Sequence, residues 1–369
     1  MRTDDFDFHL PDELIAQHPA DRRDRSRLMV VRRDAGEIEH RCFADLPDLL
    51  RSGDVLVRND SKVVPARLLG RRSATGGRWE GLFLSELPDG SWELMAQTRG
   101  RPQAGEIILI AGNGNSDSGG DGGGDGGGGG GDSGGGGLRL ELLDRLDSGH
   151  WRARPLDPRP AFELLDAFGR VPLPPYIRRV GDADDPEDRE RYQTIYASRP
   201  GSVAAPTAGL HFTAEVFDRL AALGVATLDV TLHVGPGTFR PIKAERVEDH
   251  RMHAEWAAIS PAVADRLNAA RSSGGRVVAV GTTATRVLET GVTPSGTFLP
   301  FTGQTDIYLR PGVPVLGTDA LVTNFHLPRS SLLVLVSALA GIDLIRAAYA
   351  EAVSHRYRFY SFGDAMLIL

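Results

Sequence analysis

The sequence predicts an α/β protein, with a mixed-sheet α/β body and an inserted small antiparallel β-barrel domain. Two observations predict this division. Between about residues 62 and 158 the chain carries only short strand-like segments, whereas after Pro160 strands alternate with helices. We therefore expect the body to comprise residues 1–61 and 159–369, and the inserted domain to comprise residues 62–158.

The inserted domain shows evenly spaced short apolar segments. Asp89-Gly90 stands between two of them, where a tight hairpin turn is expected. Residues 111–137 contain 17 glycines among 27 residues, and a segment of that composition cannot bury apolar surface. It is expected to be a disordered loop that connects two strands. The expected strands are Arg67–Gly70, Trp79–Glu86, Ser91–Gln97, Glu106–Ile110, Leu138–Leu143 and Trp151–Arg154.

In the body, segments with helical spacing alternate with buried apolar segments, and Gly224 is one of the helix stop signals. Crossovers of this type favour a parallel or mixed sheet, whose ligand sites lie beyond the carboxyl ends of the strands. We therefore expect the chemistry on the loops that follow the strands. The expected helices are Thr213–Leu223, Pro261–Arg271, Thr282–Thr290, Ser330–Ala340 and Asp343–Ser354, and the expected strands are Val225–Val234, Arg276–Val280 and Leu321–Thr323.

Composition narrows the class of protein. Hydrophobic residues at 41% and charged residues at 25% are near the average of soluble proteins, and no apolar run reaches the roughly 18–20 residues of a membrane span. No signal-like segment opens the chain, so we expect a cytoplasmic protein. We also expect it to be a monomer. The net charge of −7 argues against non-specific coating of nucleic acid, and the single cysteine excludes an internal disulfide. Arginine clusters at 22–27, 67–72 and 178–179 still suit local contacts with phosphates.

Polar loops rich in glycine or proline follow several of the expected strands. Such loops let the backbone approach a ligand closely, and their N–H groups can hold an anion. Histidine and aspartate side chains in these loops are candidates for proton transfer. The loops are Asn59-Asp60-Ser61-Lys62, Ala204–Phe212, Leu232–Arg240, Val280–Thr283 with Arg286, Thr323–Pro328 and Tyr357–Asp364.

Taken together and in this order, these segments resemble the S-adenosylmethionine:tRNA ribosyltransferase-isomerase family of queuosine biosynthesis. The resemblance runs from Asp7 to Met366 and includes Leu10–Pro19, Val171–Ile177 and Tyr192-Gln193-Thr194. It implies transfer and isomerisation of the ribosyl moiety of S-adenosylmethionine onto 7-aminomethyl-7-deazaguanine at the wobble position of tRNA, giving epoxyqueuosine, adenine and methionine. It implies tRNA and S-adenosylmethionine as partners, the latter consumed as a substrate, with no cofactor and no metal.

The implied reaction needs a base for the proton on the carbon beside the sulfonium and an acid for the departing adenine. Asp60, His211 and His233 are the candidate catalytic residues, although a structural role fits either histidine equally well. The glycine loops at 207–209 and 235–237 are candidates to hold the methionine carboxylate. The residues expected to bind substrate are Asn59, Lys62, Arg67, Thr207, Gly209, Gly235, Gly237, Thr238, Thr282, Thr283, Arg286, Asn324 and His326.

Other functions stay open. A tRNA-binding paralogue with a different acceptor or without catalysis is the main alternative, since Val313-Pro314-Val315 stands where the family usually places aromatic residues. An ordinary methyltransferase is disfavoured, because Val280-Gly281-Thr282-Thr283 has one glycine in place of a GxGxxG motif. A zinc site is a weaker alternative, because its ligand spacing fits no known signature. Its ligands would come from His211, His233, His250, His253, Glu255 and His326.

Overall fold

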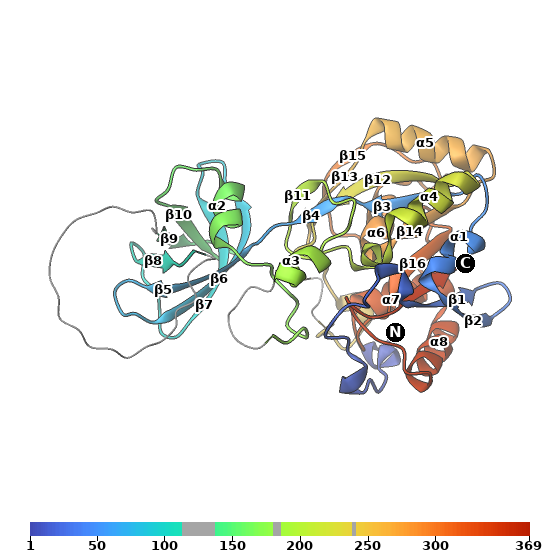
Figure 1. Ribbon diagram of the computed structural model, residues 1–369, viewed down its shortest axis with the longest axis horizontal. Coiled ribbons are helices and arrows are strands. Elements are labelled where there is room, and N and C mark those ends of the chain that lie inside the picture. The colour runs from blue at the N-terminus through green and yellow to red at the C-terminus, as the bar shows by residue number, and fades with distance from the viewer. Residues whose placement is uncertain (113–136, 180–185, 238–240) are drawn as a thin grey trace. The chain divides into compact units, whose positions relative to one another are not determined.

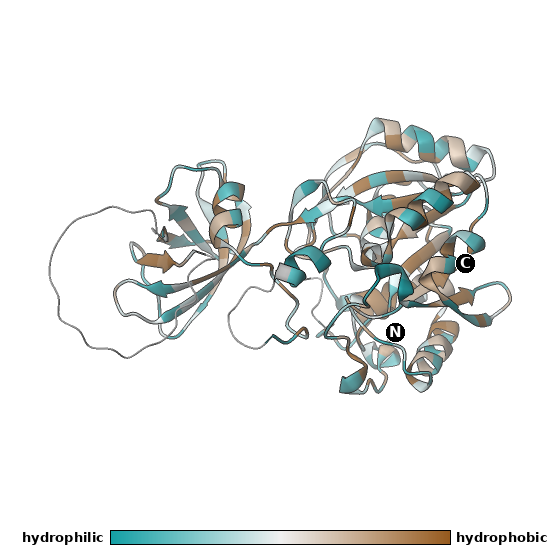
Figure 2. Ribbon diagram, viewed as in Figure 1, coloured by the Kyte–Doolittle hydropathy of each residue, from teal (hydrophilic) through white to brown (hydrophobic). Residues whose placement is uncertain are grey.

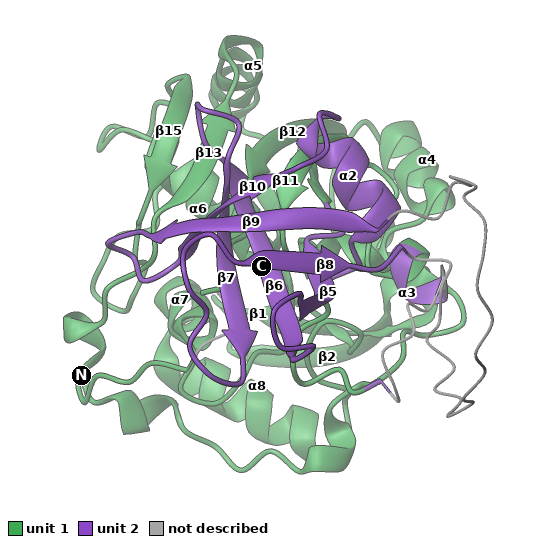
Figure 3. Ribbon diagram, turned by 90° about the vertical axis from the view of Figure 1, so that its left-hand side faces the viewer, with its two compact units in different colours: residues 1–63, 173–178, 190–369 green, residues 64–172, 179–189 purple. Residues whose placement is uncertain are grey.

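The computed structural model describes residues 1–112, 137–179, 186–237 and 241–369, which divide into two compact units (Figure 3). Unit 1 comprises Met1–Val63, Leu173–Arg178 and Glu190–Leu369, and unit 2 comprises Val64–Pro172 and Arg179–Arg189. Each unit contains its own sheet, one mixed and one closed into an antiparallel barrel, so the predicted fold class is confirmed.

Unit 1 is built on a nine-stranded sheet in the order β15-β13-β12-β3-β14-β16-β17-β1-β2 (Figure 1). Strands β12, β3, β14 and β16 are parallel to one another, whereas β17 runs antiparallel to β16 and pairs in parallel with β1. A separate parallel pair joins β4 (Ser61–Val63) to β11 (Arg199–Ser202). The sheet strands are β1 Arg27–Arg32, β2 Glu37–Cys42, β3 Val55–Asn59, β12 Ala226–Leu232, β13 Glu255–Ile259, β14 Val277–Val280, β15 Phe301–Thr305, β16 Ala320–Asn324 and β17 Ala365–Ile368.

Alternating side chains fill an apolar core on each face of this sheet. In β1, Met29 and Val31 belong to the core that contains α5, α6, α7 and α8, whereas Leu28 and Val30 belong to the core that contains α1 and α4. Figure 2 shows the hydrophobic residues along the central strands. The α-helices of this unit are α1 Leu46–Leu49, α4 Ala214–Leu223, α5 Pro261–Ser272, α6 Gly281–Gly291, α7 Ser331–Ala340 and α8 Ile342–Ser354.

Local signals set the ends of several of these helices. The side chains of Thr213, Ser260 and Ser330 accept N-cap hydrogen bonds at the starts of α4, α5 and α7. Gly224 ends α4 with a φ of +85°, and a Cβ there would lie 2.8 Å from Ser52 Oγ. The short 3₁₀ helices are η1 Thr3–Phe6, η2 Asp12–Leu14, η3 Arg23–Arg25, η4 Phe43–Asp45, η5 Thr207–His211 and η6 Val247–Asp249.

Unit 2 is a closed barrel in the order β10-β7-β6-β5-β8-β9, and Trp79 and Trp92 are buried in it. All six predicted strands are present, and Asp89-Gly90 lies in the turn between β6 and β7. Ile110 pairs with Leu138, at the two ends of the glycine-rich segment, whose residues 113–136 lie outside the described residues. The elements are β5 Arg67–Arg72, β6 Arg78–Glu86, β7 Trp92–Thr98, β8 Ile107–Ile110, β9 Leu138–Arg145, β10 Trp151–Pro155 and α2 Ala161–Phe168, and α3 Pro186–Arg191 follows.

Among the described residues, no single helix has both the length and the apolar composition needed to cross a membrane. Helices α7 and α8 meet those criteria only as a pair, and a bend of 117° separates them.

Candidate functional site

The carboxyl ends of the parallel strands meet at one edge of the large sheet, where ligand sites are expected. Because β17 and β1 run opposite to β16, their amino ends reach the same edge. The loops predicted to carry the chemistry therefore converge there. The residues at these strand ends are Ser26, Asp60, His233, Gly281, Asn324 and Asp364.

His211 is buried at this edge with both ring nitrogens engaged. The Asn324 amide Nδ2 donates to the carbonyl of Tyr360 at 3.0 Å and lies 3.2 Å from His211 Nε2, which therefore accepts. The proton is then on Nδ1, which donates to Ser26 Oγ at 2.7 Å. The ring stacks on Phe43, and burial lowers the pKa of His211 to about 4. The neutral ring thus fixes Asn324 and has no free nitrogen for a substrate proton.

His233 has a different environment. Its ring stacks on Trp256 with the centroids 5.1 Å apart, and the neighbouring Gly201 leaves no room for a larger residue, since a Cβ there would lie 3.0 Å from the ring. Nδ1 is buried without a hydrogen-bond partner among the described residues. Burial lowers the pKa of His233, and the charge of Asp60 offsets part of that effect. Unlike His211, His233 is only partly buried and its ring is not fixed by hydrogen bonds at both nitrogens, so it is the better candidate to accept a proton.

The Asp60 carboxylate is buried and held on both oxygens. Thr231 donates its hydroxyl to Oδ1 at 2.6 Å, and Ser198 donates its hydroxyl to Oδ2 at 3.0 Å. The guanidinium of Arg199 lies 3.5 Å from the same Oδ2. These contacts fix the negative charge that offsets part of the lowering of the His233 pKa by burial.

A small cavity opens between η5, the amino end of α6 and the end of β16. It has a volume of about 30 Å³, enough for roughly two water molecules. Two polar atoms of its lining residues, Thr283 Oγ1 and Asn324 Oδ1, are buried and have no hydrogen-bond partner in the described part of the chain. We call it the threonine cavity, after its polar lining residues Thr207, Thr282, Thr283, Thr323, Asn324 and His326.

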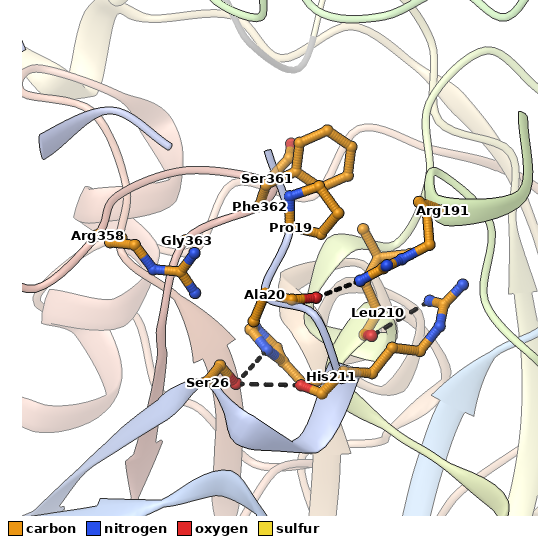
Figure 4. A pocket seen from close by; sticks show the side chains of 11 residues that line it. Pro19, Ala20, Ser26, Arg191, Leu210, His211, Arg358, Ser361, Phe362 and Gly363 are labelled. Carbon is orange, nitrogen blue, oxygen red and sulfur yellow. Dashed lines mark hydrogen bonds between the residues drawn. The ribbon is translucent and has the colours of Figure 1, made fainter. Parts of the chain in front are cut away.

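A second cavity, drawn in Figure 4, lies on the other side of the His211–Asn324 contact, because His211 lines it and Asn324 lines the threonine cavity. Arg23 donates to the carbonyl of Leu210 at 3.2 Å, and burial, followed by the charge of Arg191, lowers the pKa of Arg23. Arg358 is paired with Asp364 at 3.3 Å, and the other guanidinium groups around the cavity suit an anionic group such as a phosphate. We call it the arginine cavity, after its polar lining residues Arg23, Ser26, Arg191, His211, Arg358 and Ser361.

Two of the predicted substrate-binding residues are engaged inside the protein. Arg286 forms a buried ion pair with Glu255, which also accepts the N–H of Gly235 at 2.7 Å. Asn59 Oδ1 accepts the N–H of Leu232 at 3.0 Å, and its Nδ2 donates to the carbonyl of the same residue at 2.9 Å. The Arg286–Glu255 pair thus holds the loop at Gly235, and Asn59 joins β3 to β12.

Two of the three predicted glycines, Gly209 and Gly237, owe their identity to close packing. A Cβ on Gly209 would lie 2.0 Å from the Tyr196 hydroxyl, and one on Gly237 would lie 2.3 Å from His253 Cδ2. The N–H of Gly209 donates to the carbonyl of Pro206 at 2.8 Å, so this amide is already engaged, as is that of Gly235.

The remaining predicted residues lie elsewhere or outside the described residues. Lys62 is exposed on β4. Arg67 belongs to unit 2, where it pairs with Glu80 at 2.7 Å. Thr238 lies outside the described residues.

The structure does not bring together the six residues that the sequence suggested as potential zinc ligands. Within the described ranges, the only three potential ligands whose atoms all lie within 4.8 Å of one another are His40, Glu351 and His355, and none of them belongs to that set.

Sequence reasoning missed several residues at the edge. Ser26 precedes β1, a strand that the sequence pattern did not predict, and Trp256 lies in β13, which was also not predicted. No sequence pattern around Arg191 indicated a site residue, and only its charge distinguished it. Arg23 was noticed only as a member of an arginine cluster, a pattern that does not distinguish a cavity from a solvated surface.

Comparison with known proteins agrees with this architecture. The sequence model of the family described as queuosine biosynthesis protein matches residues 3–368. Proteins named S-adenosylmethionine:tRNA ribosyltransferase-isomerase from Symbiobacterium thermophilum and Desulfitobacterium hafniense are 52% and 47% identical, with 100% of both chains covered in each comparison. The crystal structure of S-adenosylmethionine tRNA ribosyltransferase from Thermotoga maritima is 33% identical, with a TM-score of 0.52 over 99% of this chain and 100% of that chain. The chain therefore belongs to the queuosine biosynthesis protein family.

Proposed function

We propose that this chain is an S-adenosylmethionine-dependent tRNA ribosyltransferase-isomerase. It moves the ribosyl moiety of S-adenosylmethionine onto 7-aminomethyl-7-deazaguanine at the wobble position of tRNA, where epoxyqueuosine forms as adenine and methionine leave. The observation that carries this proposal is the full-length match to relatives of that name, at 43–52% identity. The convergence of the polar loops at one sheet edge supports it.

His233 is the base in this proposal. The positive sulfur acidifies the neighbouring carbon, and a neutral imidazole with an unpartnered nitrogen can take that proton. Asp60 then stabilises the imidazolium, because its charge already raises the pKa of His233. His211 is a positioning residue, since both of its nitrogens are hydrogen-bonded to Ser26 and Asn324.

The arginine cavity is the part of unit 1 best suited to a tRNA phosphate. Of the arginines that the sequence marked for RNA contact, several are paired with carboxylates: Arg27 with Asp364 at 2.9 Å and Arg72 with Glu106 at 2.6 Å. Arg23 donates instead to the backbone carbonyls of Leu210 and Glu190. Its charge is therefore available to an anion in the cavity.

The proposed reaction uses no resident cofactor and no metal, since S-adenosylmethionine supplies its own activated leaving group and is consumed. The protein is proposed to act as a monomer in the cytoplasm, where its tRNA substrate is found. Dialysis against a chelator should leave turnover unchanged, and light scattering should give the mass of one chain. Chelator inactivation that zinc reverses would contradict the metal-free proposal.

Nucleoside analysis tests the function. The purified protein is incubated with S-adenosylmethionine and a tRNA that carries 7-aminomethyl-7-deazaguanine, and the digested tRNA is analysed by mass spectrometry. We expect epoxyqueuosine, with adenine and methionine released in equal amounts. Bound but unmodified tRNA with intact S-adenosylmethionine would favour the non-catalytic paralogue.

A further inference from the structure

The threonine cavity contains two buried polar atoms of different character. Thr283 Oγ1 is a hydroxyl that can donate, and Asn324 Oδ1 can only accept. The orientation of the Asn324 amide is fixed, because its Nδ2 donates to the carbonyl of Tyr360. Both residues are more than nine-tenths buried, at 7% and 2% exposure. Buried polar atoms are nearly always paired, so these two indicate a ligand with an acceptor and a donor of its own.

The amino end of α6 opens into the same cavity. The helix spans Gly281–Gly291; as in any helix its first N–H groups have no acceptor within the helix, and no side-chain N-cap supplies one. They favour a negative group at this end. Gly281 has a φ of +86°, which disfavours any residue with a side chain and keeps the space beside Thr283 open, since a Cβ there would lie 3.6 Å from Thr283 Oγ1.

The charge of the cavity selects the kind of ligand. None of the side chains that line it is permanently charged, and burial lowers the pKa of His326 to about 3, so that ring is neutral. A phosphate dianion usually recruits arginine or lysine, as the arginine cavity offers. A zwitterion brings its own countercharge, and a carboxylate fits a space of about 30 Å³.

We propose that the threonine cavity binds the amino-acid head of S-adenosylmethionine. The amino end of α6 and the Thr283 hydroxyl hold its carboxylate, and Asn324 Oδ1 accepts a hydrogen bond from its ammonium. The amides of Gly209 and Gly235, which sequence reasoning assigned to that carboxylate, are occupied by Pro206 and Glu255. This inference rests on the proposed function, because it names a subsite for that substrate.

Two threonines on the same helix allow a matched test. Thr283→Val removes the hydroxyl from the cavity, whereas Thr285→Val removes a buried hydroxyl that donates to the Gly281 carbonyl and does not line it. Affinities for S-adenosylmethionine and for 5′-methylthioadenosine, which lacks the amino-acid head, are measured by calorimetry with a tRNA that carries guanine at the wobble position, so that no turnover occurs. We expect Thr283→Val to weaken S-adenosylmethionine about 10- to 100-fold and to leave 5′-methylthioadenosine unchanged. Thr285→Val should change neither affinity, and Thr283→Ser should restore binding.

Decarboxylated S-adenosylmethionine tests the same contact from the ligand side. It should bind the wild type and Thr283→Val equally, because the group that the hydroxyl holds is missing. Undiminished binding of S-adenosylmethionine by Thr283→Val would overturn the subsite, as would an equal loss for 5′-methylthioadenosine. If the wild type itself binds no S-adenosylmethionine with tRNA present, the proposed function fails together with the subsite, and the wild-type measurement alone shows this.

Discussion

His211 and His233 look alike in the sequence, because each stands in a loop with glycine nearby. The structure separates them by their hydrogen bonds: His211 is bonded to Ser26 and Asn324, whereas Nδ1 of His233 is unpartnered within the described part of the chain. These partners come from segments about 100 residues or more distant along the chain, with separations of 185 and 113 residues. No local pattern could have revealed the difference.

Removing the base should abolish most of the turnover. General bases typically contribute about 10²–10⁴-fold, so His233→Ala should lower kcat by at least about 100-fold with little change in S-adenosylmethionine affinity. In the wild type, kcat/KM should fall as the pH drops through the pKa of His233, which burial holds below 6.5, because the protonated ring accepts no proton. His150→Ala, on the barrel, is the control and should retain activity. Near-normal turnover of His233→Ala would make Asp60 the leading candidate.

Two buried neutral histidines should make stability depend on pH. Burial lowers the pKa of His211 to about 4 and that of His326 to about 3, whereas both are near 6.5 in the unfolded chain. Below about pH 6.5 the unfolded state binds more protons, so the free energy of unfolding falls as the pH falls toward 4. His211 contributes at most about 3 kcal/mol to this loss. Urea unfolding across that range measures it, and His211→Gln should reduce the slope; an unchanged slope would show that the ring is not the titrating group.

Among the elements, those with a strong local pattern were predicted and those that depend on distant pairing were not. All six barrel strands and the helices α4 to α8 follow alternating or helical spacing and carry turn or cap residues. Strands β1 and β17 were missed, although Leu28 pairs with Ala365 and both residues are fully buried. Their burial depends on a partner at the other end of the chain. The arginine cavity was missed with them, because Ser26, which lines it, directly precedes β1.

The buried ion pair between Arg286 and Glu255 should be essential to the fold of its region. Arg286→Met leaves the carboxylate buried without its partner, so the free energy of unfolding should fall by about 3–5 kcal/mol. Arg219→Gln is the matched control, since it breaks an exposed pair with Asp48 and should cost less than about 1 kcal/mol. Urea unfolding compares the two variants. Equal losses would show that burial does not increase the contribution of the ion pair to the free energy of unfolding.

The glycine-rich segment should be dispensable for the barrel. Ile110 and Leu138 are paired neighbours in β8 and β9, so a short turn can join the two strands. Replacing residues 112–136 with a short linker should therefore leave the melting temperature and turnover nearly unchanged, because loop length affects stability only weakly. Thermal melts and nucleoside assays check this. A large loss of tRNA affinity would assign the segment a role in RNA binding.

At the scale of the whole molecule, the sequence predicted the presence of two kinds of structure because the pattern changes where the barrel ends. The sequence did not predict the geometry of the site, since segments from residue 19 to residue 363 contribute to the cavities. Val313 and Val315, which stand where the family usually places aromatic residues, pack against the core of unit 1 that contains α5, α6, α7 and α8. These two positions therefore have a structural role.

The most direct test of the account follows two parts of S-adenosylmethionine at once. The substrate carries one isotope in its ribosyl carbons and another in its methyl group, and tRNA with 7-aminomethyl-7-deazaguanine is the acceptor. We predict that the ribosyl label enters the tRNA, that the methyl label leaves in methionine, and that His233→Ala slows both changes by at least about 100-fold. Methyl label in the tRNA, or ribosyl label transferred at the wild-type rate by His233→Ala, would contradict the account.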